Sequence, residues 1–203
     1  MTTYTYCKLT YYNTATYLFW IISFFLTSIS LRLLHETLHG IFSVLTGGSF
    51  GTISILQWIL FYPVFSISCS GGNPFLVIEG TLIAVWFISL FIVLFTSYPV
   101  LRLIMDDCTA ANLSGKLFGV RLASVVEMFG TAVYALPNFM FYLGDGYVLG
   151  GDGTIMAMIF EQMGYSPQLQ YVMAFMMLIG SFFALYYALK CDSLICSCRW
   201  GYP

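Results

Sequence analysis

The chain has two histidines, His35 and His39, which stand one helical turn apart with Glu36 beside the first. On a helix, residues i and i+4 share a face, so both rings can direct a nitrogen at one ion, as in H-E-x-x-H zinc enzymes. Glu36 lies at the edge of that face, where it can take a proton from water and pass it to a leaving amine. The pattern predicts a zinc (Zn²⁺) site with Glu36 as the catalytic residue. The alternative is a histidine pair that only helps to pack a helix interface.

A third metal ligand must come from another residue type, because a catalytic zinc takes three protein ligands and the chain has no further histidine. Asp145 and Asp152 lie in YLGDGYVLGGDGTIM, whose glycines let the backbone run extended near a metal. Either Asp-Gly pair is also typical of an ordinary turn. The other candidates are Asp106, Asp107, Glu79, Glu127 and the cysteines.

Composition places these residues in a membrane. The chain of 203 residues is 60% hydrophobic and only 8% charged, whereas soluble domains average about 25% charged residues. A net charge of -2 from so few groups argues against nucleic-acid binding. We therefore expect an integral, multi-pass membrane protein that forms a single domain over residues 1–203, with the lipid bilayer as its surroundings.

Four apolar tracts reach the length of roughly 20 residues that a membrane-spanning helix needs. The first is a motif helix at about 15–46, which carries the histidines, and the others are spans at about 75–101, 117–143 and 168–189. Residues 51–70 are rich in β-branched and aromatic residues, contain Pro63 and lie between glycine pairs, which predicts a short β-hairpin or a re-entrant segment. The expected fold class is an all-α polytopic membrane protein with about four transmembrane helices plus this segment.

The positions of Lys and Arg indicate an orientation. With four spans, all the basic residues except Arg32 fall on one side of the membrane. By the positive-inside rule both termini are then cytoplasmic, and the histidines and Asp152 lie in the half of the membrane away from the cytoplasm.

At HETLHGIFSVLTGGSFGTISI the chain resembles the site-2-protease-like intramembrane zinc metallopeptidases, in particular their small branch of little more than a membrane core. SGGNPFLVIEG is similar to the Gly-rich start of the family's next span. LPNFMFYLGDGYVLGGDGTIMAMIFEQMGYSPQL matches the later Asn/Pro and Asp-Gly motif in outline. The resemblance covers roughly residues 30–185.

The resemblance implies Asp152 as the third ligand, because the helical run TIMAMIFEQ follows it directly, with Asp145 as the alternative. It also implies a site nearer the cytosol, in conflict with the positive-inside count. The resulting hypothesis is a zinc metalloprotease that cleaves membrane-embedded or membrane-adjacent proteins or peptides, with residues 51–70 pairing with an unwound substrate strand. The alternative is a non-catalytic membrane protein, such as a pseudoprotease or a complex subunit, with a structural metal site.

Overall fold

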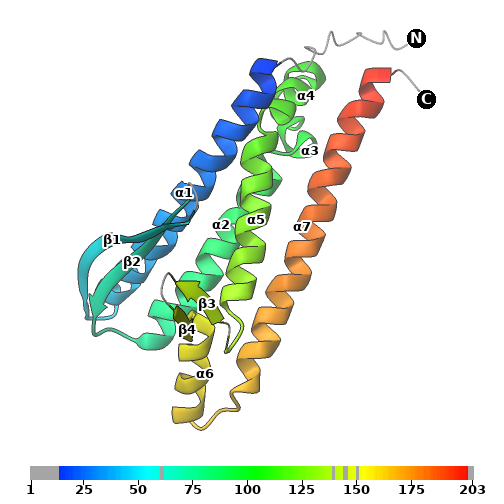
Figure 1. Cartoon of the computed structure of the whole chain (residues 1–203). Coiled ribbons are helices and arrows are strands. Elements are labelled where there is room, and N and C mark those ends of the chain that lie inside the picture. Colours follow the sequence, from blue (N-terminus) through cyan, green and yellow to red (C-terminus); the bar gives the residue numbers. More distant parts are fainter. Residues whose placement is uncertain (1–13, 60–61, 139, 144–145, 150, 201–203) are drawn as a thin grey trace.

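Long helices packed side by side form the body of the molecule (Figure 1). The computed structural model describes residues 14–59, 62–138, 140–143, 146–149 and 151–200. Its long helices are α1 (Thr14–Leu45), α2 (Thr81–Phe95), α5 (Phe118–Tyr134) and α7 (Gln168–Trp200). The mostly helical architecture expected from the sequence is therefore confirmed for the described part of the chain.

Helix α1 matches the expected motif helix of 15–46 to within one residue at each end. It ends where Gly47 adopts a φ of +91°, a left-handed conformation that glycine reaches without steric cost. The N–H of Gly48 then donates to the carbonyl of Ser43 at 2.8 Å, which closes the helix end. The histidine motif thus lies in the last third of a continuous helix.

The expected β-rich segment forms a hairpin of two antiparallel strands, β1 (Ser49–Ile59) and β2 (Tyr62–Ser70). It packs against α1 beside the histidines: a Cβ added to Gly40 would lie 2.3 Å from the ring of Phe50 and 2.9 Å from Ile67. The missing side chain at Gly40 therefore lets the hairpin approach the helix directly after His39 (Figure 1).

The expected span at 75–101 is interrupted. It consists of the π-helix η1 (Leu76–Gly80), which continues into α2, and of the separate short helix α3 (Tyr98–Leu101). Ser97 between them is extended, with ψ at 147°. Pro99 explains the break, because its ring would clash with the carbonyl of Phe95 in a continuous helix and it has no N–H to donate.

The expected span at 117–143 is wrong beyond Tyr134, where α5 ends. Pro137 follows, and Asn138 has a positive φ of 60°, so the helix cannot continue. A second hairpin, β3 (Met140–Leu143) and β4 (Gly146–Leu149), takes the place of the last turns. Helix α4 (Asp107–Lys116) precedes α5 at an angle of 56° and was not predicted.

The last part of the chain forms α6 (Asp152–Gln162) and α7, joined by a turn in which Gly164 has a φ of +79°. Helix α7 starts at the predicted residue, 168, and runs on past the predicted end at 189 to Trp200. A core cluster of small and apolar side chains, with Leu82, Ala132 and Ala174 among its members, joins α2, α5 and α7.

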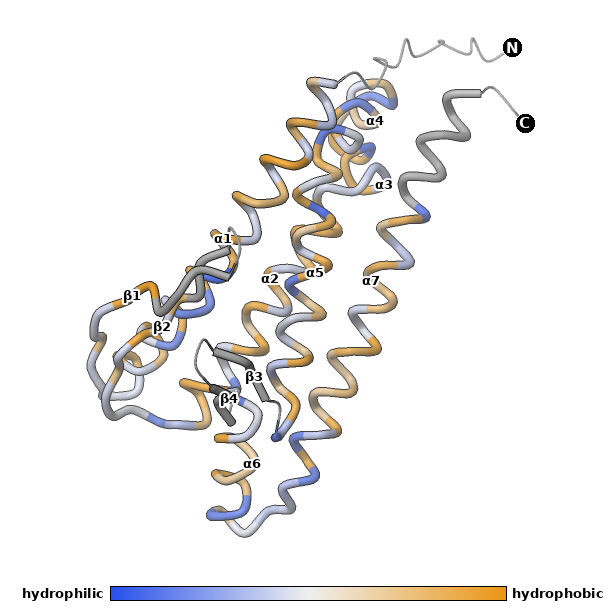
Figure 2. The backbone as a smooth tube through the Cα atoms, viewed as in Figure 1, coloured by the Kyte–Doolittle hydropathy of each residue, from blue (hydrophilic) through white to orange (hydrophobic). Residues whose placement is uncertain are grey.

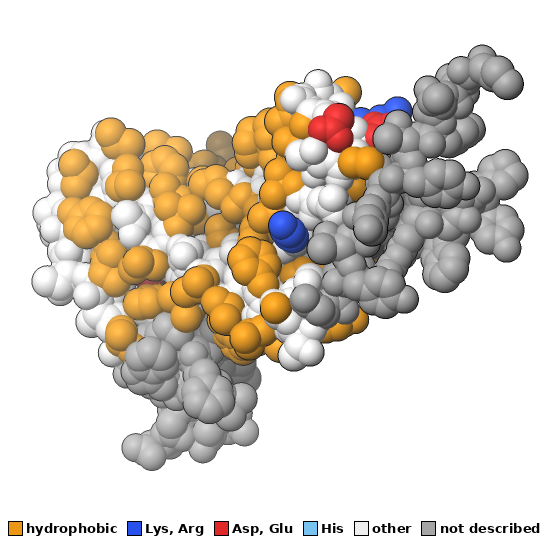
Figure 3. Space-filling view, turned by 90° about the horizontal axis from the view of Figure 1, so that it is seen from above, with side chains coloured by type: hydrophobic (Ala, Val, Ile, Leu, Met, Phe, Trp, Pro, Cys, Tyr) orange, Lys and Arg blue, Asp and Glu red, His pale blue; other side chains and the backbone are white. Residues whose placement is uncertain are grey.

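Within the described part of the chain, three helical segments are long and apolar enough to cross a membrane, namely Thr14–Leu45, Leu76–Phe95 and Gln168–Lys190. The bent pair α4–α5 makes a fourth if it counts as one span. Apolar residues run along all of them (Figure 2). Seen from above, hydrophobic side chains cover most of the described surface, and charged side chains are few (Figure 3).

Candidate metal centre

The structure brings together three of the predicted residues, His35, His39 and Asp152, as a group that could hold a metal ion. Nε2 of His35 lies 3.2 Å from Oδ2 of Asp152, Nε2 of His39 lies 3.3 Å from the same oxygen, and the two nitrogens are 3.1 Å apart. Both histidines are buried, and the side chain of Asp152 is 15% exposed. Residues 117 positions apart in the sequence thus converge on one point.

The size of this triangle fits zinc. With metal–ligand distances of about 2.0 to 2.2 Å, two ligand atoms of a tetrahedral zinc are roughly 3.3 to 3.6 Å apart. The separation of 3.3 Å lies at the edge of this range, and those of 3.1 and 3.2 Å reach it after a small outward movement. The three atoms are therefore spaced to serve as ligands of one zinc ion.

The hydrogen bonding of His39 also favours a cation. Its Nδ1 lies 2.7 Å from the carbonyl oxygen of Val77, and since a carbonyl only accepts, Nδ1 carries the proton. In the neutral ring, Nε2 then directs its lone pair at Asp152 Oδ2 and at His35 Nε2. Electron pairs this close repel each other unless a metal ion or a proton lies between them. A histidine fixed by a backbone carbonyl is also the usual arrangement around a bound metal.

Asp152 is held in place by the close packing of α6 on the end of α5. It is the first residue of α6, after Gly151, whose backbone is extended. A Cβ at Gly153 would lie 2.1 Å from the carbonyl oxygen of Ala135, so only glycine allows this approach. Burial opposes ionisation of Asp152, but its contacts with His35 and His39 outweigh burial and keep its pKa below the usual range. The carboxylate is therefore available as a ligand.

Glu36 lies on the same turn of α1 as His35 and is half-buried. Its carboxylate is within electrostatic reach of His35, His39 and Asp152, and it forms no hydrogen bond with another described residue. A carboxylate on the same helical turn as the two histidines is a candidate for proton transfer.

The other candidate ligands lie elsewhere. Asp106 and Asp107 belong to the start of α4, at the opposite end of the bundle (Figure 1). Glu127 pairs with Arg32 at 3.1 Å, and Glu79 accepts a hydrogen bond from Gln170. Asp145, the alternative third ligand, lies outside the described residues.

Two neighbours of the site were not found from the sequence. The Val77 carbonyl, which orients His39, is a backbone group and has no sequence signature. Tyr134 places its ring edge-on to His35, with centroids 6.1 Å apart. A tyrosine at the end of an apolar tract gives no signal that separates it from the many aromatic residues of this chain.

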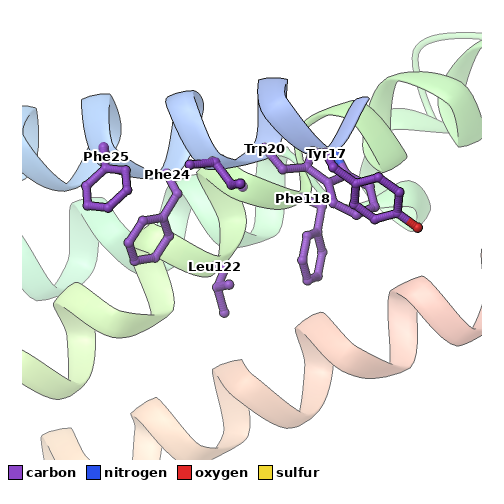
Figure 4. Close-up of a pocket in the computed structure, with 8 residues that line it drawn as sticks. Tyr17, Trp20, Phe24, Phe25, Phe118 and Leu122 are labelled. Atoms are coloured by element: carbon purple, nitrogen blue, oxygen red, sulfur yellow. The ribbon is translucent and has the colours of Figure 1, made fainter. Parts of the chain in front are cut away.

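A groove between α1 and α5 lies well away from this centre. Aromatic and aliphatic side chains line it, including Trp20, Phe24 and Phe118 (Figure 4). Phe24 precedes His35 by 11 positions, or about 16 Å along a helix. The groove therefore contributes no residue to the metal centre.

Comparisons with protein-family models, curated proteins and solved structures found no significant match to this chain.

Proposed function

We propose that this chain is an intramembrane zinc metalloprotease. The observation that carries the proposal is the triangle of His35, His39 and Asp152 with Glu36 beside it, built on a helix long and apolar enough to span a membrane. The resemblance of HETLHGIFSVLTGGSFGTISI to site-2-protease-like peptidases supports the same chemistry.

The distribution of side chains supports a position inside the bilayer. Large apolar side chains such as Phe87, Phe91 and Phe183 are more than half exposed. Polar side chains such as Thr81 and Ser181 are fully buried and donate hydrogen bonds to backbone carbonyls. This arrangement suits a lipid environment. Exposed apolar surface costs little free energy there, and polar groups must find hydrogen-bond partners inside the protein.

The proposed reaction is hydrolysis of a peptide bond. A zinc ion bound at the triangle would polarise the substrate carbonyl and lower the pKa of a water molecule to about 7. Glu36 takes a proton from the attacking water as its oxygen bonds to the carbonyl carbon. Glu36 then delivers that proton to the amide nitrogen as the C–N bond breaks, which releases an amine and a carboxylate.

The substrate class follows from the surroundings of the site. A peptide reaching it must be unwound, because a helix hides its carbonyls in its own hydrogen bonds. Among the described residues the sheet β1–β2 has only two strands, so each strand has an outer edge that pairs with no third strand, and the sheet packs on α1 next to His39. We propose that it pairs with the unwound segment of a membrane protein or peptide by strand addition.

The decisive variant is Glu36→Gln, which keeps the size of the side chain but cannot transfer a proton as a carboxylate does. It should keep zinc and lower cleavage of a panel of single-span substrates by about 10²- to 10⁴-fold. Glu161→Gln is the matched control, since Glu161 is exposed near the far end of α6, nine residues after Asp152. Equal cleavage by wild type and Glu36→Gln would contradict the protease assignment and favour a structural metal site.

A further inference from the structure

A second buried acid, Glu79, lies on η1 and has no place in the reaction above. It is completely buried, and one of its oxygens, Oε2, accepts a hydrogen bond from Nε2 of Gln170 at 3.2 Å. Gln170 is also completely buried and donates its second amide hydrogen to the carbonyl of Ala135 at 3.1 Å. The pair therefore joins η1, α5 and α7 at one point.

Both ends of this connection reach the metal centre. Glu79 lies on the π-helix whose Val77 carbonyl fixes the ring of His39, and π-helical turns are often found at functional sites. Ala135, at the other end, is the residue against which Gly153 packs, one position after Asp152. Gln170 thus connects η1, whose Val77 carbonyl orients His39, with Ala135, against which the residue after Asp152 packs.

The unsatisfied atoms of the pair indicate where a proton lies. Oε1 of Glu79 and Oε1 of Gln170 are buried and have no hydrogen-bond partner among the described residues. Two acceptors of this kind are costly. A proton on Glu79 Oε1 satisfies both oxygens at once, because the acid O–H can donate to the amide oxygen while the amide N–H donates to Glu79 Oε2.

We propose that protonated Glu79 and Gln170 form a buried acid–amide pair that positions the metal centre. The inference rests on the metal site of the proposed function and not on proteolysis. Neither residue touches the metal: the pair acts through Val77 on His39 and through Ala135 on Asp152.

The test is metal affinity in the purified full chain, measured by chelator competition for zinc and by the visible absorption of bound Co²⁺. Gln170→Met keeps the side-chain volume but removes both hydrogen bonds. It should lower zinc affinity by about 10- to 100-fold, as expected for residues that support ligands, and should change the Co²⁺ spectrum. Glu79→Gln replaces the acid by a neutral amide and should bind zinc nearly as wild type does.

Ser181→Ala is the control for packing of α7, because Ser181 is equally buried and hydrogen-bonded but lies eleven residues further along the helix. If Gln170→Met fails to fold, Gln170→Asn, which only withdraws the amide by one methylene, carries the same expectation. Wild-type zinc affinity and an unchanged Co²⁺ spectrum in a folded Gln170 variant would overturn the positioning role.

Infrared spectroscopy tests the proton directly. Wild type should show the carbonyl band of a protonated carboxyl group that is missing from Glu79→Gln, and the absence of this difference would overturn the proton assignment. Weaker zinc binding by Gln170→Met in a protein that cleaves no substrate would support the pair while the protease proposal fails.

Discussion

Buried ionisable side chains have different kinds of partners at the two ends of the helix bundle. At the α4 end, Nη1 of Arg121 donates to the Thr96 carbonyl at 2.6 Å, to the Ser114 carbonyl at 3.1 Å and to the Ser114 hydroxyl at 3.0 Å. At the other end, ligand atoms of His35, His39 and Asp152 lie within 4.8 Å of one another and could hold a metal ion. Nη1 of Arg121 finds its acceptors within the chain, whereas three converging ligand atoms can take up a cation from outside. The comparison separates a structural charge from a candidate site.

The largest effect on folding should come from Arg121→Met. It leaves the Thr96 and Ser114 carbonyls without this donor, and each unsatisfied buried group costs about 1 to 3 kcal/mol. Thermal unfolding in detergent should therefore show strong destabilisation, while the folded fraction keeps its zinc per chain. Loss of zinc from folded Arg121→Met would show that the two ends are not independent.

The next largest effect is the loss of stabilisation by zinc, which we expect only for variants of the metal centre. Zinc at 100 times its dissociation constant should stabilise wild type by about 2.7 kcal/mol, since it binds the folded state. Asp152→Ala and His39→Ala should lose this stabilisation, and zinc content measured by mass spectrometry should fall with it. Asp145→Ala serves as the matched control and should behave as wild type. The reverse result would make Asp145 the third ligand.

The smallest perturbation tests how the two ends face the membrane. Leu103 follows α3 and Tyr165 lies between α6 and α7, and both are well exposed at opposite ends of the bundle (Figure 1). Single cysteines at these positions in a cysteine-free chain should leave fold and zinc unchanged. By the positive-inside rule, Leu103→Cys should react from the cytoplasmic side and Tyr165→Cys from the other. Reaction of both from one side would rule out the arrangement, and exchanged sides would favour the orientation that the family resemblance implies.

The sequence predicted the features that depend on local pattern. The charge-free run before Arg32 and the glycines after Leu45 mark α1, and the β-branched run between glycine pairs marks the first hairpin. The position of Asp152 at the start of a helix was also readable, because the run TIMAMIFEQ begins directly after it.

The break at Ser97 and the end of α5 at Tyr134 were missed because the hydropathy of both tracts continues, although Pro99 and Pro137 mark them in the sequence. What could not be predicted depends on packing. His39 is oriented by the backbone carbonyl of Val77, and Asp152 is held in place by the close packing of Gly153 against Ala135. Gln170 reads as a polar residue at a helix start, and only the fold shows that it is buried against Glu79.

The most direct test of the metal centre is X-ray absorption at the zinc edge of the purified wild-type protein. We predict two imidazole nitrogens and carboxylate or water oxygens at about 2.0 to 2.2 Å, with no sulfur. This result would match the donor set of His35, His39 and Asp152. A sulfur shell at about 2.3 Å, or a protein that holds no zinc after purification in its presence, would contradict the proposed centre.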